Sequence, residues 1–204
     1  MRSIRISLVL LGIACGAATN AAEQDPTERI QSKTFPSVFQ AWNPADNLPD
    51  EPKEITVARH DLIWHSPRFF GLEWNNRFHG LGDAFSQQSI QRALDFRARL
   101  WKLNPNIILI AEIRYRDAYP RYLPESHEWW LRNEREHITP GWEEGKYLCL
   151  DFHNPKFRSH VAEQAKAAVT SGVMDGVMLD WWSDDPDRLA LIKEVREAVG
   201  EKAI

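Results

Sequence analysis

Short apolar runs alternate with longer amphipathic segments along most of the chain. Four of these runs contain the apolar, β-branched and aromatic residues that are typical of strands: 37–42, 60–65, 107–115 and 176–179. The third run is continuously apolar from Ile107 to Ala111, as in a parallel strand that is covered on both faces. Strands that alternate with helices predict βα units and a parallel sheet, which is the α/β fold class.

Three helices are predicted between and after these runs. The first covers residues 87–103, which carry one broad apolar face and follow Ser86, a residue suited to the N-cap. The other two are bounded by cap and stop signals: Asn154-Pro155 with Gly172, and Asp185-Pro186 with Gly200. The helix after the first strand is poorly defined. The pattern therefore predicts four strand–loop–helix units at most.

Four units are about half of a (β/α)8 barrel, which typically needs about 250 residues. We therefore expect residues 35–204 to form an incomplete (β/α)8 (TIM) barrel whose C-terminal half is missing, with Lys202–Ile204 starting a further strand. Such a chain is either a fragment of a longer product or pairs with another copy, and we favour the fragment. Two long aromatic-rich segments, 67–85 and 117–146, lack any period, and such segments are uncommon in compact domains unless they are functional.

The N-terminus has the layout of a secretory signal peptide over residues 1–22. Basic residues precede an apolar run from Ile6 to Ile13, which is shorter than the roughly 20 residues of a membrane span, and small residues follow up to Ala22. This predicts a secreted or periplasmic protein with no membrane span. Lipidation at Cys15 is the weaker alternative, because Gly12 stands where a larger aliphatic residue is usual. Residues 23–34 are polar and are expected to form a leader or linker.

The formal net charge of −4 and the lack of a basic stripe argue against nucleic acid as a partner. No glycine-rich phosphate loop follows the first strand, so we expect no nucleotide cofactor. The spacing of His60, Asp61 and His65 matches no standard zinc pattern, and no metal is expected. Nine tryptophans in 204 residues are many.

Two acids follow strands directly, at the end where barrel enzymes place their catalytic residues: Glu112 and Asp180. Cleavage of a glycosidic bond uses such a pair, one carboxyl to protonate the leaving oxygen and the other as nucleophile or base. Each acid also has a structural interpretation. An acid at a strand end often caps a helix, and Arg114 lies on the same face as Glu112, where the two residues can form an ion pair.

Aromatic and polar residues at the strand ends are the candidates for sugar binding, because aromatic rings suit the apolar faces of sugars. They are Trp42, Trp64, His65, Arg114, Tyr115, Trp181 and Trp182. Packing in the core or at the rim is an alternative role for each of the tryptophans.

Three motifs resemble the glycosyl-hydrolase-like TIM-barrel families, which are broadly similar to α-amylase-type and polygalactosaminidase-type barrels. The motifs are Ala58–Ile63, Leu150–Pro155 and Asp175–Trp182. The resemblance covers about residues 35–204 and implies a (β/α)8 barrel that acts on glycosidic bonds. It also implies that Asp180 is the active-site aspartate after the fourth strand.

Such barrels also draw active-site residues from later strands, which are absent here, and Glu112 is the local substitute for the partner acid. The predicted function is a glycoside hydrolase. The alternatives are a non-catalytic carbohydrate-binding module and an inactive truncated remnant.

Overall fold

The computed structural model describes residues 25–34, 37–41, 50–201 and 203. The expected signal peptide and Trp42 lie outside these residues. Within the described ranges, no helix is long and apolar enough to cross a membrane.

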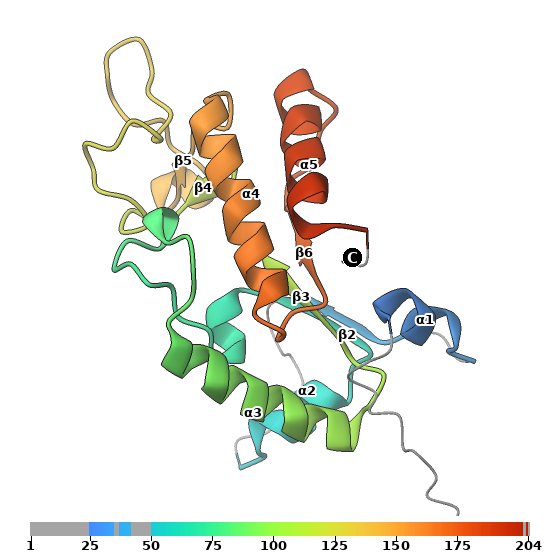
Figure 1. The fold of residues 1–204 in the computed structure, drawn as a ribbon. Coiled ribbons are helices and arrows are strands. Elements are labelled where there is room, and N and C mark those ends of the chain that lie inside the picture. Colours follow the sequence, from blue (N-terminus) through green and yellow to red (C-terminus); the bar gives the residue numbers. More distant parts are fainter. Residues whose placement is uncertain (1–24, 35–36, 42–49, 202, 204) are drawn as a thin grey trace, which may run out of the picture.

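The four predicted strands are confirmed, and they form one parallel sheet in the order β1-β2-β3-β6 (Figure 1). Their bounds are Phe39–Ala41 for β1, Leu62–His65 for β2, Ile108–Glu112 for β3 and Gly176–Met178 for β6. The register pairs His65 with Ala111 and Glu112 with Met178. The C-terminal ends of β2, β3 and β6 therefore lie at one edge of the sheet.

A helix follows each of these strands, and the predicted caps are confirmed. The helices are α2 (Lys53–Ala58), α3 (Gln87–Leu103), α4 (Pro155–Thr170) and α5 (Pro186–Val199). The side chains of Ser86, Asn154 and Asp185 accept hydrogen bonds from backbone N–H groups in the first turns of α3, α4 and α5. Gly172 and Gly200, with φ of 73° and 78°, follow α4 and α5.

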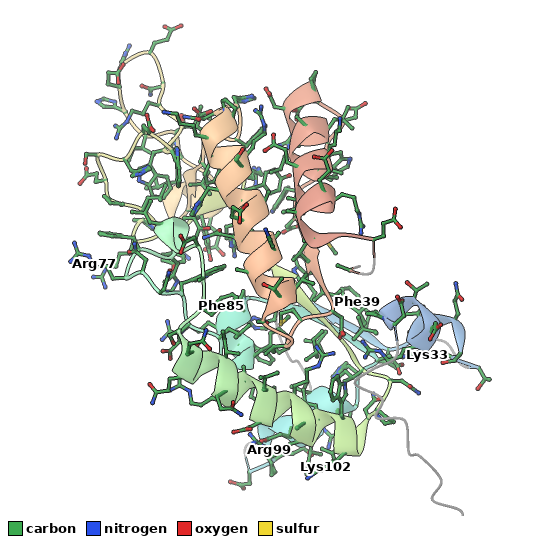
Figure 2. All side chains as sticks on the ribbon, in the orientation of Figure 1. Lys33, Phe39, Arg77, Phe85, Arg99 and Lys102 are labelled. Atoms are coloured by element: carbon green, nitrogen blue, oxygen red, sulfur yellow. The ribbon has the colours of Figure 1, made fainter. Side chains whose placement is uncertain are left out.

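The main core lies between the sheet and the helices. Ile63, Leu109 and Ala111 alternate along β2 and β3 with residues of the other face, and they pack with Leu100 of α3 and Phe157 of α4. Helix α5 stands beside α4, and α2 packs on α3 (Figure 1). Arg99 and Lys102 of α3 are exposed (Figure 2), and Arg99 forms an ion pair with Glu54 of α2 at 2.6 Å. The other face of the sheet carries a smaller apolar cluster of Trp64, Ile108 and Ile110.

The two long segments are largely irregular, as predicted, and one buried amide connects them. The first contains the short helices η2 (Pro67–Phe70) and η3 (His79–Leu81). The second contains strand β4 (Asp117–Ala118) and the short helix η4 (Glu143–Gly145), and β4 pairs antiparallel with β5 (Leu148–Cys149), which lies just beyond this segment. Gln164 of α4 donates hydrogen bonds to the carbonyls of His79 and Gly82, both at 2.8 Å, and accepts one from the Tyr122 hydroxyl at 3.2 Å.

Gly80 lets the two segments approach each other closely. Its N–H donates to the Tyr122 carbonyl at 2.9 Å, and a Cβ at this position would lie 2.6 Å from the Tyr122 ring. The loops are therefore held against α4 by specific contacts, and they cover the C-terminal edge of the sheet in a defined conformation.

Residues 25–34, the described part of the stretch 23–34 that the sequence predicts as a leader or linker, contact the sheet. They contain helix α1 (Pro26–Gln31), whose Arg29 is only 2% exposed. The guanidinium of Arg29 forms an ion pair with Asp175 and donates to the Ile107 carbonyl at 2.7 Å. The polar sequence around Arg29 contains no hydrophobic pattern from which this contact could be predicted. The partner, Asp175, is 146 residues away in the sequence.

Asp175 is the centre of a buried charged cluster at the N-terminal edge of the sheet. It forms ion pairs with Arg29 and with Arg97 of α3, the latter at 2.6 Å, and it accepts a hydrogen bond from the Leu109 N–H at 2.9 Å. The Arg97 guanidinium also lies 4.2 Å from the centre of the Trp101 ring. One carboxylate thus connects α1, α3, β3 and the start of β6.

Replacing this carboxylate tests its importance. Asp175→Asn leaves two buried guanidinium groups without a counter-charge, and loss of one partner from such a cluster costs about 3–5 kcal/mol. We expect a loss of that size in the free energy of unfolding, measured by urea denaturation. Asp95→Asn, an exposed site on α3, is the control and should leave stability unchanged. A loss below about 1 kcal/mol, which is typical of an exposed ion pair, would contradict the central role of Asp175.

Candidate active site

The two predicted acids lie at the C-terminal ends of neighbouring strands and line the same cleft. Glu112 is the last residue of β3, and Asp180 lies two residues after the end of β6. The cleft has a volume of about 910 Å³. We call it the acidic cleft because its described lining contains four carboxylates and one arginine. These charged residues are Glu112, Arg114, Asp117, Glu143 and Asp180.

Glu112 is the buried acid of the pair, with 7% of its surface exposed. Burial raises the pKa of its carboxyl, and the negative charges of Asp180 and Asp117 raise it further, whereas Arg114 opposes the shift. Asp180 is only partly exposed and accepts a hydrogen bond from the Trp181 N–H at 2.8 Å. The two carboxyls therefore have different environments within one cleft.

Arg114 forms the ion pair with Glu112 that the sequence left as an alternative. One nitrogen of its guanidinium, Nη2, lies 3.1 Å from Glu112 Oε1, and Nη1 lies 3.6 Å from Asp117. Asp117 is 3% exposed and is also paired with Arg116 at 3.0 Å. The ion pair does not exclude a chemical role for Glu112, because its carboxyl still lines the cleft and its pKa is still raised.

Trp181 and Trp182 project into the open part of the acidic cleft, with 52% and 45% of their surfaces exposed. Trp181 has a φ of 63°, which is rare for a residue other than glycine. The Tyr115 hydroxyl donates to its carbonyl at 2.8 Å, and the Arg116 guanidinium lies 4.4 Å from the centre of its ring. Such strained residues cluster at functional sites, where the surrounding contacts hold them.

The other predicted sugar-binding residues are placed differently from one another. Trp64 and His65, at the end of β2, line the acidic cleft. Trp64 is largely buried, and the His65 ring stacks on Phe69 with 4.0 Å between ring centres. Tyr115 is buried and is not among the lining residues of either large cleft, and its hydroxyl contacts the Trp181 carbonyl.

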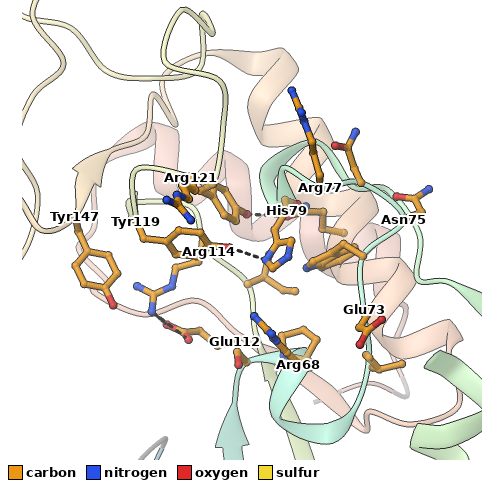
Figure 3. A pocket seen from close by; sticks show the side chains of 18 residues that line it. Arg68, Glu73, Asn75, Arg77, His79, Glu112, Arg114, Tyr119, Arg121 and Tyr147 are labelled. Carbon is orange, nitrogen blue, oxygen red and sulfur yellow. Dashed lines mark hydrogen bonds and ion pairs between the residues drawn. The ribbon is translucent and has the colours of Figure 1, made fainter.

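A second cleft, of about 720 Å³, adjoins the first (Figure 3). The two clefts share Ser66, Glu112, Arg114 and Tyr147. We call the second the basic cleft because its described lining contains four arginines and two glutamates. These charged residues are Arg68, Glu73, Arg77, Glu112, Arg114 and Arg121.

Several lining residues of both clefts come from the two irregular segments, and the sequence did not single them out. They include Arg68, His79, Asp117, Tyr119 and Trp142. The length and aromatic content of these segments indicated a functional role, but no spacing rule identifies a single residue within an irregular loop. Among the described residues, no group of three or more histidine, cysteine, aspartate or glutamate side chains could hold a metal ion.

The fold is similar to part of solved α-amylase structures. The maltogenic alpha-amylase AmyB from Thermotoga neapolitana matches with a TM-score of 0.51 and 18% identity, over 78% of this chain and 42% of that one. An alpha-amylase from Lactobacillus plantarum matches with a TM-score of 0.53 and 12% identity, over 85% of this chain and 44% of that one.

The chain thus spans less than half the length of these two proteins. At this level of identity the likeness shows the fold: a parallel α/β arrangement like part of an amylase TIM barrel. No protein-family model and no curated protein matches the sequence.

The raised pKa of Glu112 predicts that its ionisation lowers the free energy of unfolding as the pH rises. Below its ordinary pKa of 4.5, the carboxyl is protonated in both the folded and the unfolded chain. As the pH rises, the unfolded chain ionises first, so the raised pKa lowers the stability of the wild type. Glu112→Gln has no such proton to lose. We expect this variant to be more stable than the wild type at about pH 7 and equal to it below about pH 4.

Urea unfolding at the two pH values measures the difference. Glu163→Gln, at an exposed position of α4, should match the wild type at both. A Glu112→Gln variant that is less stable than the wild type at neutral pH would show that the Arg114 ion pair outweighs burial.

Proposed function

We propose that this chain acts on glycosidic bonds as a glycoside hydrolase, with Glu112 as the general acid and Asp180 as the nucleophile or base. The observation that carries the proposal is the buried Glu112 carboxyl, whose pKa is raised partly by the charge of Asp180 in the same cleft. A raised pKa keeps a carboxyl protonated at higher pH, as an acid catalyst requires.

The division of roles follows from the environments of the two acids. Glycosidic cleavage needs one carboxyl that gives a proton to the leaving oxygen and one carboxylate that attacks the sugar or activates water. Burial favours the protonated form of Glu112. Asp180 is more exposed than Glu112 and accepts a hydrogen bond from the Trp181 N–H, and we assign the second role to it. A negative cleft also suits the positive charge that develops on the sugar ring.

The aromatic lining and the fold support a carbohydrate substrate. Trp64, Trp142, Tyr147, Trp181 and Trp182 all line the acidic cleft, and aromatic faces of this kind stack on sugar rings. The two solved structures described above are alpha-amylases, and Asp180 follows the fourth strand of the parallel sheet. A secreted or periplasmic location, from the signal-peptide pattern, would place the substrate outside the cytoplasm.

A carbohydrate-binding module is the second candidate, and one observation favours it. Trp181 and Trp182 present about half of their surfaces to solvent, which gives a stacking platform that needs no acid pair. This candidate differs from the first in one respect: binding would persist without turnover.

Turnover distinguishes the two candidates. On a panel of neutral and acidic polysaccharides, we expect Glu112→Gln and Asp180→Asn each to lower kcat by about 10²–10⁴-fold, the usual contribution of a positioned acid or base. Asp184→Asn, in the exposed loop beyond the cleft, is the matched control and should retain full activity. Unchanged turnover in both acid variants would contradict the assignment. Binding without turnover, unaffected by Asp180→Asn, would favour the binding module.

The choice of substrate separates the two roles. A dinitrophenyl glycoside has a leaving group that departs without a proton, so it needs no general acid. We expect Glu112→Gln to retain most of its activity on this substrate, whereas Asp180→Asn should lose activity on both dinitrophenyl and natural glycosides. The reverse pattern would exchange the roles of the two residues.

A further inference from the structure

The basic cleft contains arginines whose charge nothing described in the protein compensates. Arg68, Arg77 and Arg121 are exposed and form no ion pair with any residue that the structure describes. Many of the other arginines are paired, including Arg97 with Asp175 and Arg158 with Glu194. A chain with a formal net charge of −4 therefore carries a concentrated, unpaired positive region beside its candidate active site.

The two glutamates of the basic cleft do not neutralise this region. Glu73 is paired at 3.2 Å with Arg92, which is not among the lining residues. Glu112 is paired with Arg114. The charges of Arg68, Arg77 and Arg121 therefore remain available to a ligand.

Figure 3 shows how the side chains divide the basic cleft. Arg68, Arg114 and Glu112 lie at one end in this view, and Arg77 and Arg121 lie at the other. Between them, the Tyr119 hydroxyl and His79 Nδ1 share a hydrogen bond of 2.5 Å. Burial lowers the pKa of His79, and the charge of Arg68 lowers it further, so the imidazole stays neutral at neutral pH. The positive charge of the cleft therefore comes from its arginines.

We propose that the basic cleft binds the anionic groups, carboxylate or sulfate, of an acidic saccharide whose backbone continues into the acidic cleft past Glu112 and Asp180. The guanidinium group presents paired N–H donors in the geometry that carboxylate and sulfate oxygens accept. The inference rests on the proposed function, because it names the class of substrate for the same site. Ser66, Glu112, Arg114 and Tyr147 line both clefts and connect them.

The opposite charges of the two clefts favour one orientation of the bound saccharide. Anionic substituents are repelled by the carboxylates of the acidic cleft and attracted by the arginines of the basic one. A neutral oligosaccharide experiences neither effect. The cleft pair should therefore bind acidic saccharides more tightly and in one orientation.

Matched ligand pairs test the proposal. Trimers of galacturonate, glucuronate and mannuronate are compared by calorimetry with their methyl esters, which keep the backbone and remove the charge. Sulfated maltotriose is compared with maltotriose, so that the two sources of negative charge are distinguished. We expect at least one charged ligand to bind about tenfold or more tightly than its neutral partner, as charged hydrogen bonds to arginine allow. The preference should shrink as salt is raised.

Variants locate the effect. Arg68→Gln and Arg77→Gln should each reduce the ratio between the affinity for the charged ligand and the affinity for its neutral partner. Arg99→Gln, which removes an exposed arginine of α3 paired with Glu54, is the control and should keep the preference. Equal binding within every pair, no binding of any ligand, or a preference that survives both cleft variants would overturn the proposal.

The measurement is repeated on Asp180→Asn, which separates this inference from the proposed function. A preference for charged ligands without turnover in the wild type would retain the basic cleft and reject the hydrolase. Cleavage of neutral saccharides with no preference for charge would do the opposite.

Discussion

Asp175 fixes the relative position of the two candidate catalytic acids, although it lies at the opposite end of the sheet from them. It exchanges backbone and side-chain hydrogen bonds with Leu109, accepting from the Leu109 N–H and donating its own N–H to the Leu109 carbonyl. These bonds set the register of β6 against β3, which pairs Glu112 with Met178. Asp180 follows two residues later. The relative position of the two acids thus depends on a carboxylate that is itself held by two buried arginines. A slip of one residue would turn the β6 side chains to the opposite face.

The regular part of the structure could be predicted from the sequence because its signals are local. The apolar run that contains β3 and the caps at Ser86, Asn154 and Asp185 each concern residues close in sequence, and the structure confirms them. Glu112 and Asp180 could be selected in the same way, since an acid directly after a buried strand is a local pattern. Their place in one cleft followed from the parallel sheet.

The remainder depends on contacts between distant residues. Arg29 sits in a stretch that reads as a polar leader, and only the fold brings it to Asp175. The loops that line both clefts are positioned by Gln164 of α4, 85 residues from His79. Tyr115 was expected at the sugar-binding surface because it follows a strand, yet its hydroxyl supports the backbone of Trp181. The position of Tyr115 after a strand correctly placed it near the cleft, but it did not reveal that its side chain points to the Trp181 backbone.

Arg114 lines both clefts, so the proposed anion binding would be thermodynamically linked to the protonation of Glu112. An anion that draws its guanidinium into the basic cleft weakens the hold of Arg114 on Glu112, so Glu112 takes up a proton more readily. Linkage is reciprocal: a protonated Glu112 releases Arg114 and strengthens the affinity for the anion. In the proposed hydrolase, binding of the anionic substrate and protonation of Glu112 would then be coupled equilibria. A chain built in this way would discriminate between charged and neutral sugars in the rate of bond cleavage as well as in occupancy.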